Sequence, residues 1–205
     1  MTMTLYYRDN TAALAPRVVL EELGESYELV ETTRDDSGPG GPPEFFAISP
    51  HGTVPAFRDG DVGMSETIAV LMYLADTHPE SPLGSALGSA ERGEWYRWLC
   101  YLANTVMTPF YGFFYPERWG GDAGAEYATT RLNELYDWLD AELADREYLV
   151  GGRYTMCDTL LGMLTLWGDE LKTALTTGRP NITAHSDRFR ARPATQKVFA
   201  AEGVK

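Results

Sequence analysis

The stretch SPHGTVPAFRDGDVGMSET, residues 49–67, contains a β-hairpin signal followed by the start of a helix. Two short runs, Val54–Arg58 and Val62–Met64, flank the turn residues Asp59–Asp61 and predict paired strands. Beyond the hairpin, apolar residues recur at helical spacing on one face: Ile68, Leu71, Met72 and Ala75. The stretch therefore predicts a ββα unit.

A βαβ unit is predicted upstream of this hairpin. Thr4–Tyr7 and Tyr27–Glu31 are short runs of β-branched or aromatic residues, which are typical of strands. Between them, a helical period ends at Gly24 and includes these residues: Pro16, Val19, Leu20 and Leu23. The Gly/Pro-rich residues 35–46 are typical of a loop before a short helix. This order of elements predicts an α/β domain over residues 1–78.

Downstream of this domain the apolar period becomes helical throughout. Residues 79–89, rich in Pro, Gly and Ser, have the composition of a linker. Three apolar stripes follow: Trp95, Trp98, Leu99, Leu102 and Val106; Leu132, Leu135, Leu139 and Leu143; Leu160, Leu164, Trp167 and Leu171. We therefore expect an all-α helical bundle over residues 90–205.

Composition excludes two classes of partner. The 205 residues carry a net charge of −13, and the 17 Lys and Arg residues form no basic run. Such a surface repels nucleic-acid phosphates and anionic membrane headgroups. The N-terminus lacks a basic start followed by an apolar run, so we expect the protein in the cytoplasm. Cys100 and Cys157 lack CxxC spacing, and we interpret both as core residues of a protein in a reducing compartment.

Three local motifs stand out, and the first two allow an interpretation beyond ordinary local structure. Pro55 at a strand start fits either an ordinary trans bond or a cis Val54-Pro55 bond. Residues 63–67, GMSET, place hydroxyls and free N–H groups at a helix start, which can hold a carboxylate or simply reflect capping by Ser65. Thr155 and Asp158 form a capping box, which we interpret as structural.

Together these segments resemble the cytosolic glutathione S-transferases, closest to the bacterial Beta-type group. The resemblance covers nearly the whole chain and rests on these stretches: LYY…APR.VLEELG…YE, F..ISPHGTVPAF, MSETIAVLMYLAD, YLVGGRYTMCDTLLGMLTLW and RPNI…H..R...RPATQKV. It implies a thioredoxin-like N-terminal domain that binds glutathione as co-substrate. It also implies that the helical domain supplies the pocket for a hydrophobic electrophile.

The resemblance assigns roles to five residues near the hairpin. Pro55 matches the family's cis-proline, and the backbone of Val54 would pair with the cysteinyl part of glutathione. Glu66 and Thr67 would hold the γ-glutamyl end. His51 stands where the family often has a basic residue near the tripeptide.

The chain departs from the Beta-type pattern at its reactive positions. The family's cysteine and the serine beside it fall on Ala12 and Ala13, and a His-Lys pair of a later helix falls on Met107 and Thr108. An enzyme–glutathione mixed disulfide at this position is therefore excluded. A redox enzyme of the glutaredoxin kind is disfavoured for the same reason.

Several groups remain as candidates for activating the thiol. Backbone N–H groups at the helix start, the hydroxyl of Thr11 and the amide of Asn10 can each face sulfur, although Thr11 and Asn10 are equally typical of helix caps. Tyr6 and Tyr7 are candidates because the tyrosine-type branch uses a phenol at the end of the first strand. One of these two tyrosines must be a core residue, since strand neighbours point in opposite directions.

An aromatic cluster follows Pro109, which should kink its helix. We expect the electrophile pocket to include these residues: Met107, Phe110, Tyr111, Phe114 and Trp167. Core packing or a dimer interface is the alternative for any one of them. The sequence thus predicts a homodimeric glutathione S-transferase without a metal site, acting on a hydrophobic, aromatic electrophile. The alternative is a non-catalytic glutathione-binding or partner-binding protein with the same fold.

Overall fold

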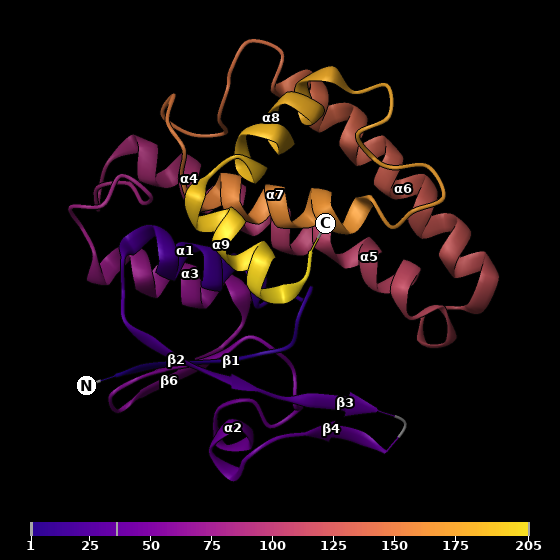
Figure 1. The fold of residues 1–205 in the computed structure, drawn as a ribbon. Helices are drawn as coiled ribbons and strands as arrows, with labels where there is room; N and C mark the ends of the chain where they lie inside the picture. The colour runs from indigo at the N-terminus through magenta and orange to yellow at the C-terminus, as the bar shows by residue number, and fades with distance from the viewer. Residues whose placement is uncertain (1, 36, 205) are drawn as a thin grey trace. The chain divides into compact units, whose positions relative to one another are not determined.

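A computed structural model describes residues 2–35 and 37–204 (Figure 1). They form two compact units, which we describe separately. The α/β unit contains the residues up to Ser81 and those from Arg192 onward, and the helical unit is Pro82–Ala191. Within the described part of the chain, no helix has the length and apolarity needed to cross a bilayer.

The α/β unit is built on a mixed sheet with strand order β2-β1-β5-β6. Its elements are β1 Met3–Tyr7, α1 Leu14–Leu23, β2 Tyr27–Glu31, β3 Thr33–Asp35, β4 Gly38–Gly40, α2 Pro43–Ile48, β5 Ala56–Asp59, β6 Val62–Ser65, α3 Thr67–Thr77 and α9 Pro193–Glu202. β1 pairs parallel to β2 and antiparallel to β5, which pairs antiparallel to β6. Figure 1 shows α1 and α3 over one face of the sheet and α2 over the other. This is the predicted thioredoxin-like arrangement.

Burial on both faces explains the composition of the central strand. Leu5 and Tyr6 of β1 point to opposite faces and are both buried. Tyr6 packs on Phe45 of α2, with ring centroids 5.6 Å apart. α1 ends where predicted, because Gly24 adopts the left-handed conformation with φ 71° and caps the helix.

The sequence did not predict the small β3–β4 hairpin. It overlaps the start of the Gly/Pro-rich stretch that we expected to be a loop, and Thr33–Asp35 pairs there with Gly38–Gly40. The three residues of β3 are all exposed. Such a pair has no buried face, so no alternation of apolar residues marks it in the sequence.

The last helix, α9, groups with the α/β unit, whereas we predicted a single helical domain over residues 90–205. It packs on α1 and buries Val198 and Phe199. Arg192 pairs with Glu22 of α1, and another α1–α9 pair joins Lys197 to Glu21. Apolar burial and ion pairs between α1 and α9 therefore explain why the last helix docks there.

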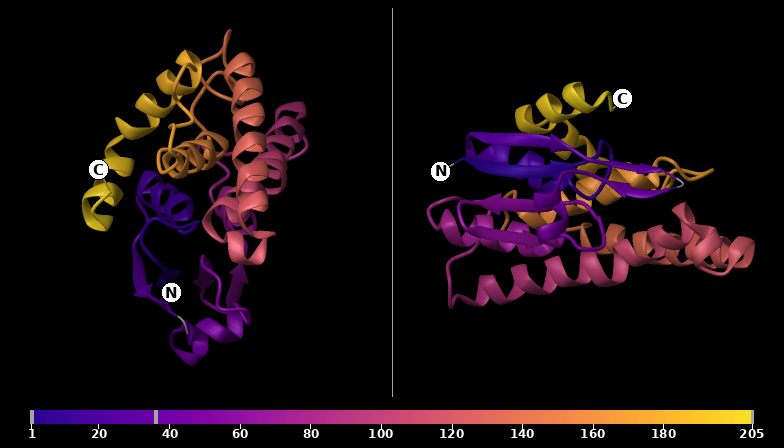
Figure 2. Two further views of the ribbon diagram at one scale, coloured as in Figure 1. Left: turned by 90° about the vertical axis from the view of Figure 1, so that its right-hand side faces the viewer. Right: turned by 90° about the horizontal axis from the view of Figure 1, so that it is seen from below.

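The helical unit surrounds one buried helix. Its elements are α4 Ala90–Tyr101, a π-helical segment Leu102–Val106, α5 Met107–Phe114, a short 3-10 helix Pro116–Arg118, α6 Gly121–Glu142, α7 Met156–Gly168 and α8 Pro180–Arg190. Every residue of α7 is buried, and Figure 2 shows this helix enclosed by the others of the unit. The predicted capping box at its start is confirmed, with Thr155 and Asp158 satisfying each other's backbone N–H groups.

Two expectations about this unit need correction. Most of the predicted linker, from Pro82 on, belongs to the helical unit, where Met156 N–H donates to the carbonyl of Leu83 at 2.9 Å. Cys157 is buried as predicted, but Cys100 is exposed. Cys100 follows the apolar stripe of α4 immediately and so falls on its outer face.

Candidate functional site

Three segments of the α/β unit meet at one end of its sheet. β1 ends there at Tyr7, and because of the antiparallel pairing β5 begins and β6 ends at the same edge. Ala56 pairs with both Tyr6 and Ser65. Continuing this register places Pro55 beside Glu66. The sheet thus brings together segments far apart in the sequence.

The first segment precedes β5 and contains the predicted cis-proline. The Val54-Pro55 bond is cis, which confirms that prediction. Pro55 is buried, and the half-buried side chain of Val54 packs on the cluster of Tyr6, Phe45 and Ala56. Within residues 2–35 and 37–204, neither the N–H nor the C=O of Val54 has a hydrogen-bond partner. This peptide can therefore pair with an extended ligand, as a strand edge does.

The second segment is the start of α3. Glu66 occupies the N-cap position with φ 76°, an unusual conformation for a residue with a side chain, and it is exposed. Since the helix begins at Thr67, Ser65 lies too early in the chain to cap it, and the capping interpretation is wrong. Thr67 is buried and donates its hydroxyl to the Ala12 carbonyl at 3.4 Å. The α3 and α1 helix starts are therefore in contact.

The third segment is the loop before α1. The helix begins at Leu14, with Ala13 as a cap that makes no side-chain hydrogen bond. Thr11 Oγ1 donates to the Arg8 carbonyl at 2.6 Å and accepts from the Ala13 N–H at 3.4 Å. Because a hydroxyl has one proton, and Thr11 donates it to the Arg8 carbonyl, none is left for sulfur in this geometry. Thr11 closes the turn before α1 and lies too early in the chain to be its cap. The Ala12 N–H has no acceptor among the residues that the structure describes.

The two tyrosines of β1 point in opposite directions, as predicted. Tyr6 is a core residue against Phe45, so its candidacy as the activator was wrong. Tyr7 is half-buried, and the guanidinium of Arg17 lies 5.1 Å from the centroid of its ring. Burial, assisted by the nearby Asp9, raises the pKa of the Tyr7 phenol. Tyr7 therefore stays protonated near neutral pH, and its phenol can donate a hydrogen bond.

The predicted candidate Asn10 is linked to two residues that the sequence analysis did not single out, Arg17 and Glu202. Asn10 is exposed with φ 51°, and its backbone N–H donates to Glu202 Oε2 at 2.9 Å. Glu202 Oε1 accepts from Arg17 at 2.8 Å. Arg17 on the buried face of α1 was a visible signal, since arginine is rarely buried unpaired. Nothing in the sequence links it to Glu202.

His51 lies apart from the helix starts. It is exposed in the turn that the Gly52 N–H closes by donating to the Ser49 carbonyl at 2.9 Å. Arg8 reaches this turn by donating to the Gly52 carbonyl at 3.4 Å. His51 thus stands two residues before the Thr53–Pro55 segment, and its side chain faces solvent.

The predicted pocket residues of the helical unit form an aromatic cluster. Trp167 makes edge-to-face contacts with Phe110 and Phe114 at 5.7 and 5.9 Å between centroids. Phe110 is fully buried and Trp167 nearly so, whereas Tyr111 is exposed and donates to the sulfur of Met107 at 3.5 Å. The structure therefore brings these five residues together around α5.

A π-helical segment precedes this cluster. It spans Leu102–Val106 and joins α4 to α5. Pro109 lacks the N–H that would bond to the Thr105 carbonyl, so the α-helical ladder is interrupted next to this segment. π-helical turns within α-helices often occur at functional sites.

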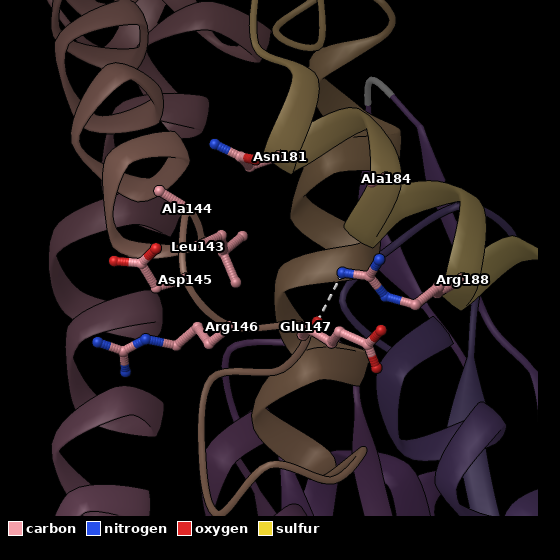
Figure 3. Close-up of a pocket in the computed structure, with 8 residues that line it drawn as sticks. All are labelled: Leu143, Ala144, Asp145, Arg146, Glu147, Asn181, Ala184 and Arg188. Atoms are coloured by element: carbon pink, nitrogen blue, oxygen red, sulfur yellow. Dashed lines mark hydrogen bonds between the residues drawn. The ribbon is translucent and has the colours of Figure 1, made fainter.

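The hollow in Figure 3 is not part of the predicted site. It has a volume of about 390 Å³, and none of the predicted site residues lines it. Arg188 donates there to the Glu147 carbonyl at 2.7 Å, and Arg146 pairs with Glu142 at 3.3 Å. Its cationic groups are therefore already engaged. Among the described residues, no group of three or more side chains could hold a metal ion.

Comparisons with known proteins agree with this arrangement. Two family profiles match the chain: "Glutathione S-transferase, N-terminal domain" at residues 14–82, and "Glutathione S-transferase, C-terminal domain" at residues 101–193. The chain is 30% identical over 207 residues to glutathione S-transferase GstA of Escherichia coli O157:H7, which covers 99% of this chain and 100% of that protein.

Solved structures of similar proteins share the whole fold. The beta class glutathione S-transferase of Sphingomonas chungbukensis is 27% identical with a TM-score of 0.87, covering 98% of this chain and 100% of that one. A sphingomonad glutathione S-transferase complexed with glutathione is also 27% identical, with a TM-score of 0.88 over 98% of this chain and 100% of that one.

Proposed function

The chain belongs to the glutathione S-transferase family, and we propose that it joins the thiolate of glutathione to a hydrophobic, aromatic electrophile. Glutathione is the co-substrate of this enzyme. The observation that supports the proposal best is the meeting of three segments at one end of the sheet. They offer the exposed carboxylate of Glu66 together with the backbone of Val54 and the N–H of Ala12, which have no hydrogen-bond partner among the described residues.

Each segment would bind one part of the tripeptide. The cysteinyl residue of glutathione is an extended peptide, and the N–H and C=O of Val54 can pair with it. Glu66 would attract the γ-glutamyl ammonium, while the N-terminal N–H groups of α3 and the hydroxyl of Thr67 would hold its carboxylate. His51 would contribute near the glycine end. The Thr67–Ala12 contact would then bring the thiol to the start of α1.

The start of α1 would activate the thiol without a reactive side chain. A cysteine thiol has a pKa of about 8.5, and a helix N-terminus lowers it because free N–H groups and the helix dipole stabilise the thiolate. The Ala12 N–H is the donor that we assign to sulfur. Tyr7 remains the competing donor, while Asn10 would act through its backbone.

The proposed reaction needs only glutathione, the electrophile and water. The thiol proton passes to water, and the thiolate sulfur forms a bond to the electrophilic carbon. In a substitution, the leaving group departs with the bonding electron pair; in an addition, the resulting carbanion takes a proton from water. In the aromatic cluster, the accessible side chains of Tyr111 and Phe114 would contact the apolar part of the electrophile, while the buried Met107, Phe110 and Trp167 would support them.

The direct test combines binding with turnover. Calorimetry should detect reduced glutathione binding in the micromolar to millimolar range usual for metabolites. The same preparation should consume a chloronitroaromatic compound faster than free glutathione does at the same pH. No heat at millimolar glutathione, together with no rate above the free reaction, would contradict the proposal.

We also place the enzyme in the cytoplasm as a homodimer. Exposed aromatic side chains on α4 and α6, such as Tyr96 and Trp138, support an association of two copies. Sedimentation at micromolar concentration should give about twice the monomer mass of 22.8 kDa. A single species at the monomer mass would contradict the dimer and leave the chemistry untouched.

A further inference from the structure

A buried carboxylate of α9 lies behind the loop that would hold sulfur. The side chain of Glu202 is 1% exposed, and that of its partner Arg17 is 8% exposed. Glu202 Oε2 accepts from the backbone N–H of Asn10 at 2.9 Å, and Oε1 accepts from Arg17 at 2.8 Å. The carboxylate thus connects the last helix of the chain to its first loop and first helix.

Stabilisation of the α1–α9 contact is a poor explanation for this burial. Desolvation of a buried ion pair often cancels its attraction, and apolar residues of similar volume would serve as well. Burial raises the pKa of Glu202 even though Asn10 and Arg17 both favour its ionised form. The two helices are already joined by Arg192–Glu22 and Lys197–Glu21, in which solvent reaches at least one partner.

Orientation of the loop is the better explanation. Asn10 adopts the left-handed conformation, and the bond from its N–H to Glu202 fixes the peptide plane before it. Thr11 and Ala12 follow directly, so fixing this plane restricts the directions in which their N–H groups can point. The hydroxyl of Thr11 is directed to the Arg8 carbonyl, so the thiol donors of this loop are backbone groups.

We propose that Glu202 is a positioning residue for thiolate formation: it holds Asn10 so that the Ala12 N–H is directed at the sulfur of bound glutathione. The inference rests on the proposed function and deepens it. Preorganised backbone donors act only when their direction is fixed before the ligand arrives. In this chain, the residue that fixes the direction of these donors is Glu202, which lies 192 positions after Asn10.

The test replaces Glu202 with glutamine, which keeps the shape and removes the charge. Glu202→Gln should raise the thiol pKa of bound glutathione by about one unit and lower kcat/KM near pH 7 about tenfold. The affinity for glutathione should change less than about threefold, since the γ-glutamyl contacts remain. The thiol pKa is read from the ultraviolet absorbance of the thiolate in the enzyme–glutathione complex as pH is varied.

Glu22→Gln is the matched control, because Glu22 also pairs with an arginine across α1 and α9 but contacts no loop N–H in the described structure. It should leave the thiol pKa unchanged. Glu202→Asp keeps the charge but shortens the reach, so it should fold and raise the thiol pKa in part.

The outcomes separate this inference from the proposed function. If both Glu202 variants melt at lower temperature but keep the wild-type thiol pKa, Glu202 is structural only and the inference is overturned. If glutathione forms no thiolate on the wild-type enzyme, the proposed activation itself is wrong. A raised thiol pKa in the Glu202 variants, with the Glu22→Gln value unchanged, supports the positioning role.

Discussion

The N-terminal ends of α1 and α3 lie at the same end of the sheet and carry opposite kinds of chemistry. At α3, Glu66 exposes a carboxylate and Thr67 contributes a hydroxyl. At α1, Ala12 and Ala13 contribute only methyl groups beyond the backbone. The 3.4 Å hydrogen bond from Thr67 to the Ala12 carbonyl joins the two ends.

The site that we propose therefore uses side chains at one helix end and backbone groups at the other. A side-chain site depends on residue identity, so a single substitution removes it. A backbone site depends on peptide orientation, which neighbours such as Thr11 and more distant residues such as Glu202 maintain. The two ends should therefore respond differently to substitution.

Ala12→Cys should produce the largest change, because it adds a nucleophile where the wild type has only a backbone. In a Cys100→Ser background, which removes the exposed native thiol, the new cysteine should form a nearly complete mixed disulfide with oxidised glutathione. Mass spectrometry would detect the adduct. Binding of reduced glutathione without any adduct would mean that position 12 does not face the sulfur.

Glu66→Ala should weaken glutathione binding about 10- to 100-fold, because a charge-assisted hydrogen bond contributes about 1.5–3 kcal/mol. Calorimetry measures the loss. Asp61→Ala is the matched control: its carboxylate is also exposed, but it lies in the turn at the opposite end of the β5–β6 hairpin. Equal losses in the two variants would point to general electrostatics rather than a γ-glutamyl contact.

Thr11→Ala should lower the rate less than tenfold, because its hydroxyl is directed to the Arg8 carbonyl and not to sulfur. The free energy of unfolding should fall by about 1 kcal/mol, as when one intramolecular hydrogen bond is lost. Stopped assays with a chloronitroaromatic substrate and urea unfolding provide the two values.

Tyr7→Phe is the companion variant for that experiment. With the backbone of α1 as the donor, its rate should also stay within tenfold of the wild type. A loss of about a hundredfold in Tyr7→Phe would instead identify the phenol as the thiol donor. The same loss in Thr11→Ala would show that its hydroxyl turns to sulfur when glutathione binds.

The sequence was informative wherever function or packing depends on residue type. The segments around Val54-Pro55 and Glu66 indicated the fold and the cis bond, and the capping box at Thr155 was visible as a motif. These features occupy neighbouring positions in the chain. Local spacing therefore carries their signal.

The features that the sequence did not reveal depend on contacts between distant residues or on backbone geometry. The β3–β4 hairpin has no apolar face, and α9 joins the α/β unit through charges that pair with α1. The choice between Tyr6 and Tyr7 needed the direction of β1 side chains. The link from Asn10 to Glu202 has no sequence signal, because any peptide N–H can donate.

The smallest predicted effect concerns the other ends of the same two helices. His78 follows α3, and its Nε2 lies 2.8 Å from Glu25, which follows α1, while Nδ1 lies 2.9 Å from the Leu74 carbonyl. Both partners are acceptors, so both ring nitrogens can donate only in the charged imidazolium. Burial alone lowers the pKa of His78, but these hydrogen bonds outweigh it and raise the pKa above its usual value.

This raised pKa gives the pair a defined pH dependence. The stability that it contributes is fully present below the unfolded pKa of about 6.5 and is lost as pH rises through the higher folded pKa. His78→Gln should therefore lower the free energy of unfolding by up to about 1 kcal/mol near pH 5.5 and by less near pH 9. Urea unfolding at both pH values measures this loss of stability, and Glu25→Gln should reproduce the trend.

Because the His78–Glu25 ion pair fixes only the C-terminal ends of α1 and α3, neither variant should change the thiol pKa of bound glutathione. A change in that pKa would mean that α1 and α3 move as rigid bodies. Substitutions at the two helix starts could then no longer be interpreted independently of each other.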